Sequence, residues 1–212
     1  MRMAQQADPA IERSLRTVTE TATECVATLP TVVHCYAEHD PAQADVVERI
    51  GTLESRCDEE VQSLRRSIAA AGQSFSEAYL FAPDVLALAY EIDRVASASE
   101  QFATELAAIE PSLSPGAEQS MLEHARRSTA AADRLRRGVE AALDDQPVSD
   151  AVDAIRAAES ACDRLKYQIL AGAKGSPGQL LMVRQFAVTL DAVPNAVEDA
   201  ADSLGQLRAG GV

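Results

Sequence analysis

Apolar residues recur at alternating steps of three and four along almost the whole sequence, and this helical spacing is the strongest constraint on the fold. The first run, for example, places Ile11, Leu15 and Val18 on one side of a helix. Six such runs cover residues 11–36, 46–68, 85–109, 117–142, 152–169 and 183–207. Stripes with this spacing form the seams of antiparallel bundles. We therefore expect an all-α fold, a six-helix antiparallel bundle in a single domain that spans residues 1–212.

Proline and glycine mark where these helices are expected to begin and end. A capping side chain followed by proline precedes four of the runs, at residues 8–9, 40–41, 114–115 and 176–177. The second, third and fifth runs are expected to end at Gly72, Pro111 and Gly172. The connection from the second to the third helix is expected to extend from Gly72 to Pro83.

The two halves of the sequence match one another. The pattern Ile-x-x-x-Glu-x-x-Cys-Asp occurs at residues 50–58 and again at residues 155–163. The third apolar run can likewise be laid on the sixth, which aligns Asp93 with Asp191. We interpret the chain as two three-helix repeats, about 9–111 and 114–208. Each repeat is too small to bury its apolar seam alone and is completed by the other.

The charge of the chain excludes some functions. It carries 33 acidic and 19 basic residues, a net charge of −14, which would repel the phosphate backbone of a nucleic acid. Lysine is scarce, with only Lys166 and Lys174, and this composition suggests a salt-adapted protein. The sequence has neither an apolar run long enough to span a membrane nor a signal peptide pattern, so we expect a cytoplasmic protein. Its four cysteines are expected to be buried free thiols.

Repeated acidic pairs are the best candidates for chemistry. Two carboxylates one helical turn apart can chelate a cation if a neighbouring helix supplies further oxygen ligands. Such pairs occur at matching points of both repeats, and an aspartate of the third or sixth run is placed to complete each one. The two candidate metal sites consist of Glu54, Asp58 and Asp93, and of Glu159, Asp163 and Asp191. The alternative is that these acids lie at the bundle margin, pair with arginines and bind no ion.

Three patterns together resemble PhoU-like proteins, in particular their phosphate transport regulator branch. They are the repeated Ile-x-x-x-Glu-x-x-Cys-Asp, the Leu-Ala-x-x-Ile-Asp that ends at Asp93, and Val-Glu-Asp-Ala-Ala-Asp at 197–202. The resemblance implies a cytoplasmic, often dimeric bundle that regulates phosphate uptake without catalysis. Its partner would be a phosphate transporter or an associated sensor protein, and only through that partner would it reach the membrane.

The resemblance also bears on the metal. It implies that the acidic motifs hold iron or another hard divalent or trivalent cation, with manganese, magnesium and zinc as less favoured ions. Where related proteins tend to carry a further acid, this sequence has Ser97 and Asn195, which weakens both sites. Weaker candidate ligands lie on the last helix: Asn195, Glu198, Asp199 and Asp202.

Two other functions stay open at this point. One is a metal-free structural or interaction bundle, in which the acids serve salt adaptation alone. The other is a metal-dependent oxidase or hydrolase, which is disfavoured because the chain has three histidines and no Glu-x-x-His motif. Nucleotide binding has no support, since neither common glycine-rich phosphate-binding motif occurs.

Overall fold

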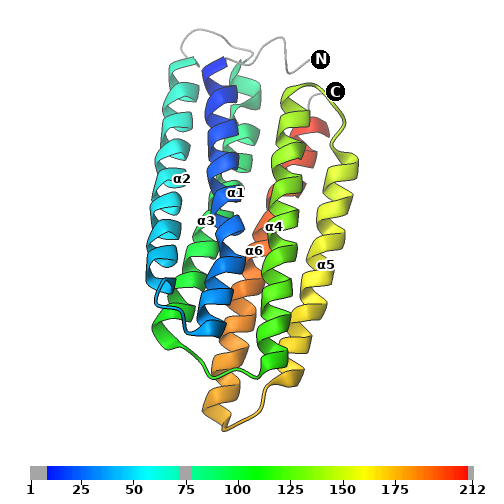
Figure 1. The fold of residues 1–212 in the computed structure, drawn as a ribbon. Coiled ribbons are helices and arrows are strands. Elements are labelled where there is room, and N and C mark those ends of the chain that lie inside the picture. Colours follow the sequence, from blue (N-terminus) through cyan, green and yellow to red (C-terminus); the bar gives the residue numbers. More distant parts are fainter. Residues whose placement is uncertain (1–8, 72–77, 210–212) are drawn as a thin grey trace.

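The computed structural model describes residues 9–71 and 78–209, and these residues form six α-helices and no strand (Figure 1). The helices are α1 (Pro9–Glu38), α2 (Gln43–Ala71), α3 (Ala78–Ile109), α4 (Pro115–Leu143), α5 (Ser149–Gly172) and α6 (Pro177–Ala209). Consecutive helices run in opposite directions along one long bundle. This confirms the all-α six-helix antiparallel bundle predicted from the periodicity.

Four of the helices form the centre of the bundle. α1 packs against α3 and α4, and α6 packs against α3 and α4, so the two halves of the chain meet along both α1–α4 and α3–α6. α2 lies outside this centre against α1 and α3, and α5 lies outside it against α4 and α6. Each outer helix therefore packs on the two central helices of its own half.

Most helix ends fall where the capping residues place them. Ser114 accepts a hydrogen bond from the backbone N–H of Ala117, and Pro115 occupies the first turn of α4. The expected start of α3 is wrong, because the helix begins at Ala78 and contains Pro83. A proline this near a helix start removes only one intrahelical hydrogen bond, so the helix continues through it. Gly72 lies outside the described residues.

The cysteines are free and buried, as predicted. Cys57 donates a thiol hydrogen bond to the carbonyl of Val18, with a sulfur–oxygen distance of 3.7 Å. In the second half, Cys162 lies 4.0 Å from the carbonyl of His124 in the same arrangement. The two halves thus use equivalent thiol contacts between an outer and a central helix. None of the described helices has the length and apolar character needed to cross a membrane.

Candidate functional site

Acidic side chains gather at two equivalent places, each between an outer and a central helix. We call Glu54, Asp58 and Asp93 the first acidic group, and Glu159, Asp163 and Asp191 the second acidic group. The first group joins α2 to α3, and the second joins α5 to α6. Their central members differ in burial, because Asp93 is half-buried whereas Asp191 is 4% exposed.

The first acidic group contains no neutralising base. Glu54 accepts a hydrogen bond from Ser97, with an oxygen–oxygen distance of 3.2 Å, and Asp58 accepts one of 2.9 Å from Gln62. None of the group's three carboxylates forms an ion pair with a residue that the structure describes. The Oδ1 atom of Asp93 is buried and has no hydrogen-bond partner among the described residues. A negative charge at this atom is therefore poorly compensated.

The electrostatics of Asp93 follow from this environment. Burial raises the pKa of its carboxyl above the ordinary value of 3.8. The neighbouring Cys57 thiol partly offsets the increase, while the negative charges of Asp58 and Glu54 raise the pKa further. A proton or a cation would relieve the repulsion among these carboxylates.

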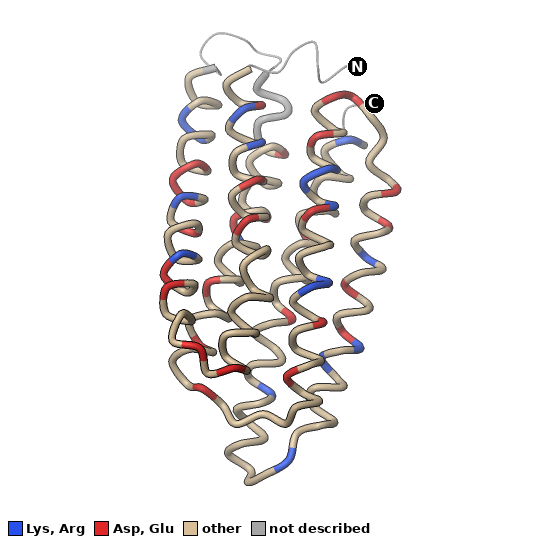
Figure 2. The backbone as a smooth tube through the Cα atoms, viewed as in Figure 1, with Lys and Arg blue, Asp and Glu red and all other residues tan. Residues whose placement is uncertain are grey.

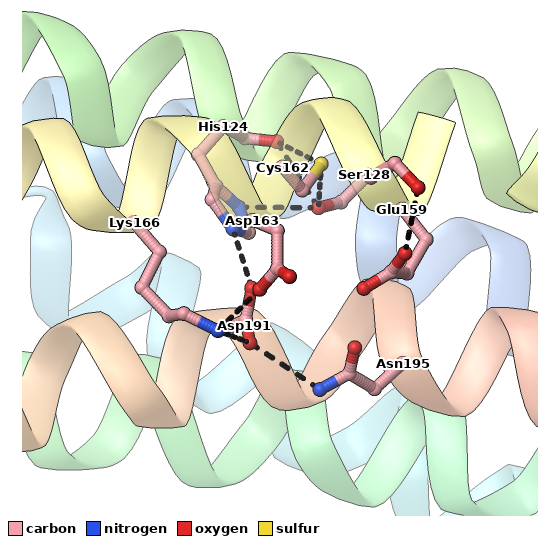
Figure 3. Close-up of polar contacts among 9 residues, drawn as sticks. His124, Ser128, Glu159, Cys162, Asp163, Lys166, Asp191 and Asn195 are labelled. Atoms are coloured by element: carbon pink, nitrogen blue, oxygen red, sulfur yellow. Dashed lines mark hydrogen bonds and ion pairs between the residues drawn. The ribbon is translucent and has the colours of Figure 1, made fainter. Parts of the chain in front are cut away.

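The second acidic group is held by a lysine (Figure 3). Lys166, on α5 one turn after Asp163, forms ion pairs with both Asp163 and Asp191. Its Nζ atom lies 2.7 Å from Oδ2 of Asp191. Burial lowers the pKa of Lys166, but the hydrogen bonds and charges of the two aspartates outweigh this effect and raise its pKa above the ordinary value. The ammonium group therefore stays charged and compensates the charges of Asp163 and Asp191. Glu159 forms no ion pair with a described residue, and burial followed by the charge of Asp163 raises its pKa.

Two more residues surround Asp191. Nε2 of the fully buried His124 lies 3.5 Å from Oδ1 of Asp191, and Asn195 donates to Oδ2 over 3.3 Å. Burial alone would raise the pKa of Asp191, but the hydrogen bonds from His124 and Lys166 and their charges lower it below the ordinary value. The pKa values of the equivalent residues Asp93 and Asp191 are thus shifted in opposite directions.

The pKa values of Asp93 and Asp191 shift in opposite directions because the two repeats carry different residues at two positions. Val61 occupies the first-half position that corresponds to Lys166, and Val18 occupies the one that corresponds to His124. The repeated sequence pattern predicts equivalent acidic groups and does not indicate that Lys166 and His124 contact Asp191. One signal was present, since Lys166 follows Asp163 by three residues and is one of only two lysines in the chain.

Neither acidic group is gathered tightly around one point. Within residues 9–71 and 78–209, no three His, Cys, Asp or Glu side chains lie close enough together to hold a metal ion. Of the weaker candidates, Asp199 pairs with Arg94, and Asp202 pairs with Arg156. Glu198 is half-buried, and burial followed by the charge of Glu159 raises its pKa. Metal binding stays a prediction that requires these side chains to move.

Comparisons with known proteins found similar solved structures. No family model matches the sequence, and the comparison with curated proteins found no match. A crystal structure described as a PhoU-like phosphate regulatory protein from Shewanella oneidensis MR-1 matches with a TM-score of 0.81 and 13% identity, covering 97% of this chain and 99% of that chain. A PhoU-like protein from the same organism matches with a TM-score of 0.81 and 14% identity, covering 94% of this chain and 99% of that chain. At these identities the likeness establishes the fold.

Proposed function

We propose that this protein is a non-enzymatic regulator of inorganic phosphate uptake that acts on a membrane transporter or its sensor partner from the cytoplasmic side. The observation that carries the proposal is the structural match to a phosphate regulatory protein over nearly the full length of both chains. A match of this extent leaves little of either chain for an unrelated domain. The patterns in the sequence that resemble PhoU-like proteins point the same way.

The contacts of His124 with Ser128 and Asp191 favour an adaptor over a hydrolase. Ser128, His124 and Asp191 have the residue types of a hydrolytic triad, and His124 lies within 3.5 Å of both other side chains. Ser128 and His124 are fully buried, however, and the serine hydroxyl donates to the backbone carbonyl of His124. A nucleophile that no substrate can reach does not serve hydrolysis, so the cluster is better explained as packing of α4 against α5 and α6.

The proposal includes a cation at the first acidic group. Among the residues that the structure describes, its three carboxylates have no basic partner and the buried Oδ1 of Asp93 has no hydrogen-bond donor. Such an oxygen is suited to a hard cation such as iron, manganese or magnesium. Lys166 already pairs with two of the three carboxylates of the second acidic group, which makes that group the poorer site. A bound cation would supply charge compensation between α2 and α3. Its gain or loss would favour one of two packings of these helices and so alter docking on the partner.

Metal binding is tested by thermal unfolding with Mn²⁺ or Fe²⁺ added to protein treated with chelator. We expect the ions to raise the Tm of the natural protein and to have no effect on the Asp93→Asn variant. Glu159→Gln, a change in the second acidic group, is the matched control and should keep the response. An equal Tm shift in all three proteins would contradict a site at Asp93.

The alternative function is a metal-free interaction bundle. It is favoured by the absence of any three metal-binding side chains in contact within the described part of the chain. No bound metal in protein purified without chelator, together with no Tm response to added ions, would decide for this alternative. The resemblance also predicts a homodimer, which analytical ultracentrifugation would test.

The regulatory role is tested in cells that lack the gene. Uptake of radiolabelled phosphate should stop responding to the external phosphate concentration, and the natural gene should restore the response. Uptake of an unrelated solute, such as an amino acid, serves as the control. An unchanged phosphate response in the deletion strain would refute the proposed role.

A further inference from the structure

Exposed apolar side chains concentrate on one hairpin. Among the described residues, seven large apolar side chains are exposed, and five of them lie on α5 and α6 between Tyr167 and Val188. The strongest exposure lies within the first two turns of α6, where Leu180, Leu181 and Met182 are 41%, 67% and 37% exposed. Successive helical residues point about 100° apart, so these three side chains face three different directions. The start of α6 is thus apolar on several sides.

The part of this hairpin around the α5–α6 connection is free of acidic residues. Residues 164–190 contain four basic residues and no acidic one, whereas all 33 acids of the chain lie elsewhere. Lys166 is used by the second acidic group, but Arg164, Lys174 and Arg184 are exposed and form no ion pair with a described residue. A basic and apolar segment therefore stands out from a strongly acidic protein.

The hairpin also protrudes from the bundle. The α5–α6 connection and the first turns of α6 extend beyond the α1–α2 and α3–α4 connections at the same end (Figure 1). Those two connections carry acids, including Asp40 and Glu110, and Figure 2 shows the protruding end without acids. A flat anionic surface could thus meet the hairpin before it meets the acidic remainder of the protein.

We propose that this hairpin tip, residues 164–188, docks directly on a bilayer of anionic phospholipids. Arg164, Lys174 and Arg184 would lie at the headgroup phosphates, and Leu180, Leu181 and Met182 would enter the boundary between headgroups and acyl chains. This replaces the expectation that the protein reaches a membrane only through a partner. It does not rest on phosphate regulation, because bilayer binding requires neither transporter nor phosphate.

The arrangement fits a bilayer better than a protein partner. A protein surface usually covers one face of a helix, whereas a bilayer surrounds the end of a protruding hairpin. Apolar side chains pointing in three directions from one turn match the second case. Basic residues on both sides of the turn match the negative surface potential of anionic lipids, which attracts each base separately.

Binding to vesicles tests the proposal. We expect the full chain to co-sediment with vesicles of phosphatidylcholine mixed with phosphatidylglycerol and not with vesicles of phosphatidylcholine alone. Lys174→Gln and Arg184→Gln should each weaken binding about fivefold. Leu181→Ser should weaken it about tenfold or more. Arg126→Gln and Tyr90→Ser, which change an exposed arginine and an exposed tyrosine outside the tip, are the matched controls and should bind normally.

The absence of tryptophan from the chain allows a direct probe. In a Leu181→Trp variant the only tryptophan lies in the tip, and its emission should shift to the blue with anionic vesicles. Emission of a Tyr90→Trp variant should not change. The proposal is overturned if the Leu181→Trp emission does not shift and the protein stays in solution. It is overturned equally if binding appears only with vesicles that contain membrane proteins, because the tip would then recognise a protein.

Discussion

Replacing Lys166 by methionine tests the electrostatic account of the second acidic group. The change removes the ammonium group that pairs with Asp191, whose side chain is 6% exposed, and keeps most of the apolar stem of the lysine. Breaking a buried ion pair from one side costs about 3–5 kcal/mol, because the remaining charge stays buried without a partner. Water reaches part of the ion-pair network around Lys166, since the side chains of Lys166 and of its second partner Asp163 are 16% and 42% exposed. We therefore expect a loss of about 2–3 kcal/mol in the free energy of unfolding.

The assay is urea unfolding at one fixed salt concentration, followed by helical circular dichroism. Lys174→Met is the matched control, because Lys174 is the only other lysine in the sequence, is exposed and forms no ion pair with a described residue. Its effect should stay within about 0.5 kcal/mol. The double variant Lys166→Met with Asp191→Asn should recover much of the lost stability, since it removes the stranded charge. Equal stabilities of the Lys166→Met and Lys174→Met variants, or no recovery in the double variant, would refute the reasoning.

Three more predictions concern Asp93, the thiols and helix packing. The pKa of Asp93 is raised in the folded protein, so its charged form opposes folding above that pKa. We therefore expect Asp93→Asn to raise the free energy of unfolding by about 1 kcal/mol near pH 7. In urea unfolding measured at several pH values, this gain should vanish below about pH 4. Burial and the nearby charge of Glu54 raise the pKa of Cys25 to about 12, so a chromogenic disulfide reagent should label this thiol only after unfolding; equally fast labelling of native protein would contradict this. A Cβ atom on Gly138 would lie 3.1 Å from Leu204, so Gly138→Val should cost about 2 kcal/mol and lower the Tm, whereas the uncrowded Gly116→Val should not.

Local sequence signals were sufficient to predict the helices and most of their ends. Apolar spacing defines which side of each helix is buried, and a residue such as Ser114 specifies a helix start through its own hydrogen bond. The start of α3 was mispredicted because proline was read as a boundary, although a helix tolerates Pro83 near its beginning. These are properties of short segments, so they are visible without knowledge of the remaining chain.

The partners of Asp191 could not be predicted in the same way. Apolar periodicity shows that Asp191 and His124 each lie beside a buried seam, but it does not fix how far α4 is shifted along α6. That shift decides whether two polar side chains meet. The repeat suggested equivalent sites, yet Val61 in place of Lys166 and Val18 in place of His124 shift the pKa values of Asp93 and Asp191 in opposite directions.

The placement of the helix ends has a practical consequence. α1 begins and α6 ends at the end of the bundle opposite the α5–α6 connection (Figure 1). An affinity handle joined before Pro9 or after Ala209 would hold the molecule on a sensor chip with the α5–α6 connection pointing into the flowing sample. Lipid particles or extracted transporters could then be passed over an oriented layer of the protein, and one preparation would measure both lipid binding and transporter binding.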